Sequence, residues 1–289
     1  MPAVLQASLQ SPPSGRATPV WFDAQAYCRE KLLGGAEVPW TAPGELAAFF
    51  GKAQGMFASD ALVVEVGDLC AQRVVAGDPA LSEAMGRRSR VAFALRTLLA
   101  DDRLRTTATE ALEAAAGAAE GTPVVLSIPS PARWMAIAAE QAGAPTGVAG
   151  TPDPDHVDTA SMYVADFLRT FADAPVDACM LDESTSGGDV LVDVEAYRPV
   201  LNVAAHYEWP VWLRSDRVPC WPRGDRDGVA GWLGSAPPAQ PAGAWGVVVG
   251  PEEWLASGSL PEVGGGAVVA IVPAAADPDA VMQRVRELR

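Results

Sequence analysis

Residues 61–66 read ALVVEV, a short run of branched apolar side chains with a single carboxylate at Glu65. Consecutive apolar residues are typical of a strand that is buried on both faces, as in a parallel sheet. Similar runs recur at 123–128 (PVVLSI), 178–181 (ACML), 211–213 (VWL), 245–249 (WGVVV) and 268–272 (VVAIV). Most intervals between them are long enough for a helix, so the sequence predicts an α/β fold.

Helix signals fill these intervals. Asp78 and Pro79 are suited to begin a long helical region that reaches about residue 120, and Asp155 is suited to cap a helix that continues to residue 171. Apolar residues at helical spacing predict further helices over residues 44–57, 192–206 and 279–288. Strands that alternate with helices form either an open sheet or a closed (β/α)8 barrel.

The barrel is favoured, as a single domain. The chain contains neither a GxGxxG nor a GxxxxGKS motif, which removes the commonest reason to prefer an open nucleotide-binding sheet. Its 289 residues suit a barrel of about 250 residues. The intervals 143–150 and 218–234 are long enough to contain strands beyond the six predicted runs. Residues 1–15 are predicted to form a mobile tail, and residues 16–289 the barrel.

Composition excludes several classes of protein. The chain is 49% apolar with a net charge of −15 and a pI of about 4.5, which excludes a disordered chain and disfavours nucleic acid as a partner. No apolar run approaches the roughly 20 residues that cross a bilayer. Four cysteines lie far apart without a CxxC motif, which suggests reduced thiols. We therefore expect a cytoplasmic protein, with no membrane partner, that binds a small molecule.

The residues that follow each strand meet at one mouth of a (β/α)8 barrel, where catalytic groups lie. An acidic residue in such a position is more often a helix cap or a surface charge than a catalytic group. Asp68 is the strongest candidate because it follows an apolar strand and must either point into the mouth or find a partner. The positions that follow strands are Glu65, Asp68, Ser127, Ser130, Arg133, Asp182, Glu183, Ser184, Arg214, Ser215, Asp216, Glu252 and Glu253.

A zinc site is an alternative to a site without metal or cofactor. His206, Cys220, Cys179 and Glu183 are residues of the types that bind zinc. Against this, His206 stands at the end of an apolar helix, where it can cap the last carbonyls, and Cys179 lies within a strand, where its side chain suits the core.

Four segments resemble the uroporphyrinogen decarboxylase family, a group of (β/α)8 barrels that also contains cobalamin-independent methionine synthases and corrinoid methyltransferases. The segments are 18–26 (TPVWFDAQA), 58–69 (ASDALVVEVGDL), 122–135 (TPVVLSIPSPARWM) and 180–187 (MLDESTSG). The resemblance places Asp68 on the aspartate that binds the pyrrole N–H groups of the substrate. It also places Ser184 on a serine that contacts a substrate carboxylate, and it implies a homodimer.

The departures from the family pattern point to a different substrate. The two arginines that receive substrate carboxylates are replaced by Ala24 and Cys28, with only Arg29 nearby. A porphyrinogen would lose most of its cationic partners, so we expect a smaller and less anionic substrate.

Taken with the resemblance, these residues predict a lyase of the decarboxylase type that needs no cofactor. Asp68 would be its central polar group, and Ser184, Arg133, Arg214, Arg29 and Glu183 would bind the substrate. The alternatives are a zinc-dependent thiol methyltransferase and a non-catalytic binding or accessory protein.

Overall fold

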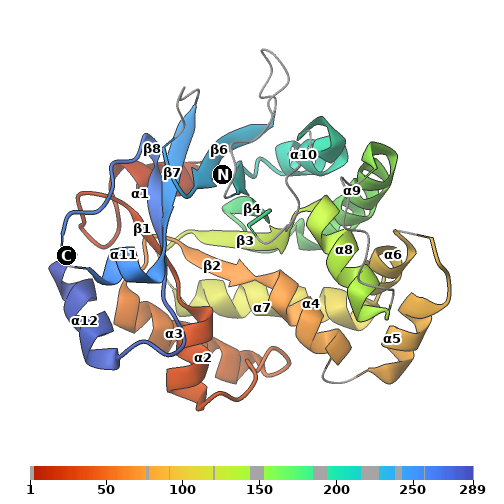
Figure 1. Ribbon diagram of the computed structural model, residues 1–289, viewed down its shortest axis with the longest axis horizontal. Coiled ribbons are helices and arrows are strands. Elements are labelled where there is room, and N and C mark those ends of the chain that lie inside the picture. The colour runs from red at the N-terminus through yellow and green to blue at the C-terminus, as the bar shows by residue number, and fades with distance from the viewer. Residues whose placement is uncertain are drawn as a thin grey trace.

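The computed structural model describes residues 3–75, 78–90, 92–119, 121–143, 153–184, 194–215, 228–237, 243–256 and 258–288. Within them, eight parallel strands form one sheet in the order β1-β8-β7-β6-β5-β4-β3-β2 (Figure 1). Because β1 also contacts β2, the sheet is a nearly closed (β/α)8 barrel, which confirms the predicted fold. The strands are β1 (Val20–Asp23), β2 (Leu62–Glu65), β3 (Val124–Pro129), β4 (Ala178–Asp182), β5 (Val211–Arg214), β6 (Val229–Gly234), β7 (Ala244–Val249) and β8 (Gly265–Ile271).

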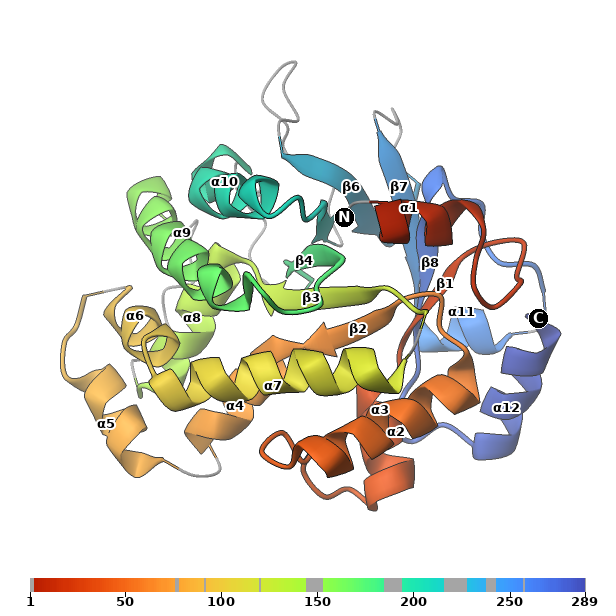
Figure 2. The same cartoon turned by 180° about the vertical axis from the view of Figure 1, so that it is seen from behind.

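Helices cover the outside of the barrel (Figures 1 and 2). None of the described helices is long and apolar enough to span a bilayer. The α-helices are α1 (Ala3–Gln10), α2 (Gln25–Leu33), α3 (Pro43–Phe57), α4 (Val66–Val75), α5 (Pro79–Gly86), α6 (Phe93–Leu99), α7 (Asp102–Ala118), α8 (Pro131–Gln141), α9 (Pro154–Leu168), α10 (Arg198–His206), α11 (Pro251–Leu255) and α12 (Pro278–Glu287), with 3-10 turns η1 (Arg169–Phe171) and η2 (Val194–Tyr197).

The predicted strands match β2, β3, β4, β5, β7 and β8 within a few residues. Strand β6 lies inside the interval 218–234, which was long enough to contain a further strand. Most of the other interval, 144–150, lies outside the described residues. Strand β1 (VWFD) was missed, although it is as long as β5 (VWLR), which was predicted.

The long helical region divides into α5, α6 and α7, because new caps interrupt it. The Asp78 carboxylate accepts a hydrogen bond from the Leu81 N–H at 3.1 Å and begins α5, as predicted. Asp101 accepts from the Leu104 N–H at 2.7 Å and begins α7. Asp153, in place of the predicted Asp155, caps α9.

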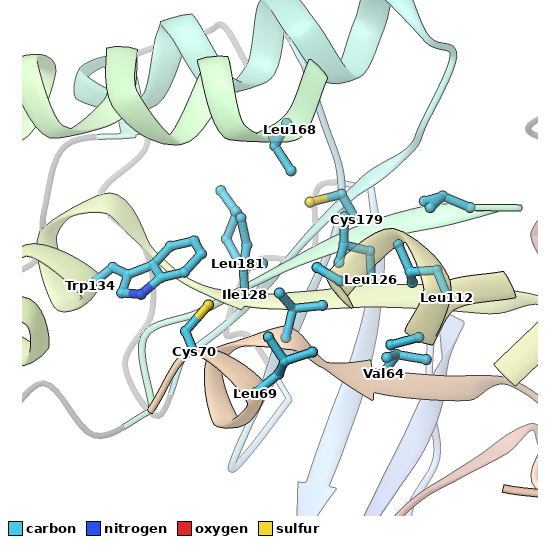
Figure 3. Packing of buried hydrophobic residues seen from close by; sticks show 14 of the residues in the cluster. Val64, Leu69, Cys70, Leu112, Leu126, Ile128, Trp134, Leu168, Cys179 and Leu181 are labelled. Carbon is cyan, nitrogen blue, oxygen red and sulfur yellow. The ribbon is translucent and has the colours of Figure 1, made fainter. Parts of the chain in front are cut away.

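Side chains alternate between the barrel interior and the layer of helices. Strand residues that face outward pack against α4, α7, α8 and α9, and Figure 3 shows Val64, Leu126, Ile128 and Leu181 in this layer. A second apolar cluster fills the interior and includes Trp21, Val125, Met180, Trp212, Leu233, Val248 and Val269. The alternation follows from the two-residue period of a strand.

The middle of the interior is filled by an aromatic pair. The rings of Trp21 on β1 and Trp212 on β5 meet edge to face, with centroids 5.8 Å apart. In the strand order, three strands separate β1 from β5 along the sheet, so this pair crosses the barrel. Packed apolar side chains therefore fill the interior of the barrel beneath the mouth.

Helix α1 packs against the same interior cluster. Leu5 and Leu9, one helical turn apart, join that cluster and are 1% and 9% exposed. The Ser8 hydroxyl donates a hydrogen bond to the Asp60 carbonyl at 2.6 Å. The prediction of a mobile tail over residues 1–15 therefore does not hold for α1, because the buried side chains of Leu5 and Leu9 hold this helix against the barrel.

Side chains of the segment before β2 close the barrel between β1 and β2. The Val20 N–H donates to Asp60 Oδ2 at 2.9 Å, and the Phe22 N–H donates to Ser59 Oγ at 3.1 Å. Arg16, 4% exposed, pairs with the fully buried Asp60 carboxylate at 3.5 Å. These bonds satisfy backbone donors of β1 where no strand ladder joins it to β2 among the described residues.

Candidate functional site

Polar side chains replace the apolar interior at the carboxyl ends of five strands. Strand residues two positions apart point to the same side of a sheet, so each residue that follows an interior position by two also points inward. Trp21, Val63, Val125, Met180 and Trp212 are the interior positions. The corresponding polar residues are Asp23, Glu65, Ser127, Asp182 and Arg214, and they form the floor of the mouth.

Arg214 crosses this floor. Its Nη1 atom binds Asp23 Oδ2 at 2.9 Å, and the two side chains are 8% and 30% exposed. Asp23 ends β1 and Arg214 ends β5, so the ion pair spans the barrel directly above the Trp21–Trp212 pair. The guanidinium is therefore fixed at the centre of the mouth.

Glu65 is the most strongly perturbed acid of the mouth. Its Oε2 atom accepts a hydrogen bond from Ser127 Oγ at 2.8 Å. Burial, followed by the negative charges of Asp23 and Asp182, raises the pKa of Glu65 from the ordinary 4.5 to about 8, against the opposing effects of Arg214 and Ser127. A carboxyl with this pKa carries a proton at neutral pH and can exchange it in catalysis.

Asp182 behaves in the opposite way. Its Oδ2 atom pairs with Arg133 Nη1, and its Oδ1 atom accepts a hydrogen bond from the Ser184 N–H at 2.8 Å. Burial would raise the pKa of Asp182, but Arg214, Arg133 and the bond from Ser184 outweigh burial and keep the pKa below its ordinary value. Asp182 is therefore ionised where Glu65 is protonated, and such a divergence of two neighbouring carboxyls marks acid–base sites.

Asp68 lies at the rim of the mouth, one helical turn beyond the strand. Strand β2 ends at Glu65, so Asp68 is in the first turn of α4 and its side chain is exposed. The Gln25 amide donates to Asp68 Oδ2 at 2.6 Å. Partial loss of hydration, with the nearby Asp23 charge, raises the pKa of Asp68, while Gln25, Arg133 and Arg29 act in the other direction. Asp68 therefore reaches the mouth from the first turn of α4, beyond the end of strand β2.

Glu183, the next predicted binding residue, is held by an aromatic hydroxyl. The Tyr197 hydroxyl donates a hydrogen bond to Glu183 Oε1. Tyr197 is 1% exposed, and burial, with the Glu183 charge, raises its pKa well above 10. Tyr197 therefore remains a hydrogen-bond donor and fixes the side chain that follows β4.

The predicted residues thus lie around one mouth, but their roles differ from the expectation. Arg133 and Arg214 were expected to bind a substrate carboxylate, whereas both are paired with carboxylates of the protein. Arg29 is exposed on α2, near enough to Asp68 to affect its pKa. Ser184 contributes its backbone N–H to the site.

Sequence reasoning missed Asp23 and Tyr197 and did not select Glu65. Asp23 was overlooked with its short strand, although a carboxylate directly after three apolar residues was a usable signal. Tyr197 lies 14 residues beyond Glu183 and has no local signal.

The described residues do not assemble the alternative zinc site. Cys179 is fully buried in the layer between β4 and the helices, where Figure 3 shows its sulfur, and burial raises its pKa to about 12. His206 is exposed at the end of α10, and Cys220 lies outside the described residues. In the described part of the chain, no three His, Cys, Asp or Glu side chains are grouped so that they could hold a metal ion.

A cavity of about 690 Å³ lies away from the mouth. It is bordered by α4, α7 and the segment before α3, and its lining includes Trp40, Leu69, Arg73 and Arg103. Arg73 is already paired with Asp78 at 2.8 Å. None of the strand-end residues of the mouth lines this cavity, so we do not assign the chemistry to it.

Comparisons with known proteins do not assign the chain to a family. No family model matches it, and no curated protein sequence matches it. Among solved structures, it is similar to 2,3-dimethylmalate lyase, described as a PEP mutase/isocitrate lyase superfamily member. The two are 13% identical with a TM-score of 0.37, over 99% of this chain and 83% of the other.

These findings correct the resemblance to the uroporphyrinogen decarboxylase family. No family model matches this chain, so none supports that family, and the similar solved structure is named as a member of a different superfamily. The four segments that suggested the family are β1, β2, β3 and β4 with the residues that flank them. Short apolar strands followed by polar residues recur in every (β/α)8 barrel, so their likeness reflects the fold. The methyltransferase alternative depended on the same resemblance and is withdrawn with it.

Proposed function

We propose that the mouth of the barrel is the active site of a lyase that acts on a small molecule, with Glu65 as its proton donor. The observation that carries this proposal is the contact network of Asp23, Glu65, Ser127, Asp182 and Arg214, which come from five different strands. Residues from several strand ends that converge at this face are the usual source of catalytic groups in barrel enzymes.

The protonation states support an acid role for Glu65. A carboxyl with a pKa of about 8 is mostly protonated at neutral pH and readily ionises as it gives up its proton. Ser127, which donates to Glu65 Oε2, fixes the orientation of the carboxyl. Arg214 lies close enough to stabilise the carboxylate that forms.

The simplest step of this kind is the loss of CO2 from a small carboxylic acid. The bond between the carboxylate carbon and its neighbour breaks, and the electron pair stays on that neighbouring carbon. Carbon dioxide leaves, and the carbon takes the proton from Glu65. Water then returns a proton to the Glu65 carboxylate and becomes hydroxide, so atoms and charge balance.

Solvent exchange provides the test. Wild-type protein is incubated in D2O with a panel of small oxo acids, hydroxy acids and amino acids, and proton NMR follows product formation and deuterium incorporation at carbon. We expect turnover by the wild type and a loss of at least about a hundredfold in Glu65→Gln, the usual lower bound for a general acid. Glu110→Gln, an exposed residue on α7, is the matched control and should retain wild-type turnover.

Two results would overturn the proposal. Turnover that survives in Glu65→Gln would show that Glu65 is not the proton donor. No turnover of any compound by the wild type would favour the non-catalytic binding protein.

A further inference from the structure

The centre of the mouth contains a hydrogen-bond donor that has no acceptor in the described part of the chain. The side chain of Arg214 is 8% exposed, and its Nη1 atom binds Asp23 Oδ2 at 2.9 Å. Its Nε atom is buried and lacks a hydrogen-bond partner among the described residues. A buried donor without an acceptor is costly, so it indicates a position that a ligand or water fills.

This donor belongs to a side chain that lies beside the proposed proton donor. Burial and the charge of Asp23 have the largest effects on the pKa of both Glu65 and Arg214, and the charge of each of these two residues also acts on the other. Nε of Arg133 likewise lacks a partner among the described residues, but the side chain of Arg133 is 18% exposed. Arg214 is the more deeply buried of the two arginines, so its Nε atom has the stronger need for an acceptor.

The proposed loss of CO2 determines where such a donor is useful. The electron pair of the broken bond stays on the carbon that carried the carboxylate. If a carbonyl group is attached to that carbon, the pair is shared with the carbonyl oxygen and an enolate forms. A 3-oxo acid has its carbonyl in this position, whereas a 2-oxo acid or an amino acid does not. A cationic hydrogen-bond donor stabilises the enolate oxygen as its negative charge develops.

We propose that the substrate is a small 3-oxo carboxylic acid and that Arg214 Nε donates a hydrogen bond to its carbonyl oxygen, which becomes the enolate oxygen as CO2 leaves. This inference rests on the proposed function and names the class of its substrate. In an enolate, a single carbon separates the oxygen from the carbon that takes the proton. The donor to the oxygen and the acid that protonates the carbon must therefore be neighbours, as Arg214 and Glu65 are.

The electrons and charges of this step balance. The pair from the broken bond forms the double bond of the enolate, and the carbonyl pair moves onto the oxygen beside Arg214. When Glu65 gives its proton to the carbon, the carbonyl bond forms again. Water then returns a proton to Glu65 and becomes hydroxide. The negative charge of the substrate thus moves from the departing carboxylate to an oxygen beside a guanidinium.

Selectivity among four-carbon acids is the first test. Wild-type protein should convert 3-oxobutanoate, measured above its spontaneous loss of CO2 without protein, but neither 2-oxobutanoate nor 3-hydroxybutanoate. Arg214→Lys keeps a positive charge opposite Asp23 and places a methylene group where Nε stands. It should lower the rate with 3-oxobutanoate about ten- to a hundredfold, the usual value of a hydrogen bond to a charged group. Arg103→Lys, an exposed residue on α7 away from the mouth, is the matched control and should retain the wild-type rate.

A stable enolate provides the second test. Pentane-2,4-dione cannot lose CO2, and its enolate absorbs at a longer wavelength than the neutral compound. Glu65→Gln cannot protonate the enolate, so titration of this variant at pH 7 should produce the enolate band. Arg214→Lys, added to Glu65→Gln, should weaken enolate binding about ten- to a hundredfold, whereas Arg103→Lys added to the same variant should not change it.

Absence of the enolate band, or an equal band with and without Arg214→Lys, would overturn the inference. Turnover of hydroxy acids or amino acids without turnover of 3-oxobutanoate would also overturn it, but would leave the proposed lyase in place. The dione titration requires neither turnover nor transfer of a proton from Glu65. A missing band therefore contradicts the substrate class alone, whereas failure of every acid to react contradicts the lyase itself.

Discussion

Replacement of Glu65 by glutamine is expected to change how the stability of the protein depends on pH. A carboxyl whose pKa is higher in the folded state favours folding while it is protonated. This contribution is complete below the ordinary pKa of 4.5, decreases as the pH rises and is lost above about 8. Each pKa unit corresponds to about 1.4 kcal/mol, so the contribution at low pH is at most roughly 5 kcal/mol.

Glutamine has the shape of the protonated carboxyl and still accepts the hydrogen bond from Ser127, but it does not ionise. Glu65→Gln and the wild type should therefore have similar free energies of unfolding at pH 5. At pH 9 the variant should be more stable by a few kcal/mol, because the wild type must then bury an ionised carboxylate.

Urea denaturation of both proteins at pH 5, 7 and 9 measures this difference, with Glu110→Gln as the control that should follow the wild type. A difference between Glu65→Gln and wild type that stays constant from pH 5 to pH 9 would refute the reasoning. It would mean that Glu65 titrates normally in the folded protein and that the mouth does not keep it protonated.

Three other changes test the fold. Asp60→Ala should lower the free energy of unfolding by about 3–5 kcal/mol, because it leaves the Arg16 charge buried and unpaired; a loss under 1 kcal/mol in urea denaturation would contradict the closure of the barrel described above. Leu5→Ala should cost about 2–5 kcal/mol, whereas a mobile tail would show no change in the same assay. Cys179→Ala should leave the reaction of the native protein with a thiol reagent unchanged, since burial raises the pKa of this thiol to about 12; a lower count of reactive thiols would show that Cys179 is accessible.

The local pattern of the sequence was enough to predict the class of fold. A strand of a parallel sheet is buried on both faces and therefore reads as a continuous apolar run. Each run, such as PVVLSI, shows this property by itself. The same pattern located most of the polar residues that follow strands, because the end of an apolar run marks the end of a strand. The prediction nevertheless omitted β1, although VWFD is as long as the VWLR of β5 and begins with three apolar residues in the same way.

The grouping of the site residues depended on tertiary structure. Arg214 and Asp23 are 191 positions apart in the chain, and only closure of the barrel brings them together. For the same reason the arginines expected to bind a substrate carboxylate are occupied by carboxylates of the protein. A local sequence pattern does not show which of several carboxylates will lie nearest to a given arginine.

By itself, then, the sequence determined that strands and helices alternate and that polar residues collect at the carboxyl ends of the strands. The tertiary structure decided that Glu65 is the acid with the raised pKa, that Asp68 belongs to the rim, and that Leu5 and Leu9 join the interior cluster of the barrel. Periodicity acts over neighbouring residues and is visible in the chain. A pKa depends on burial and on charges from other strands, which exist only once the barrel has closed.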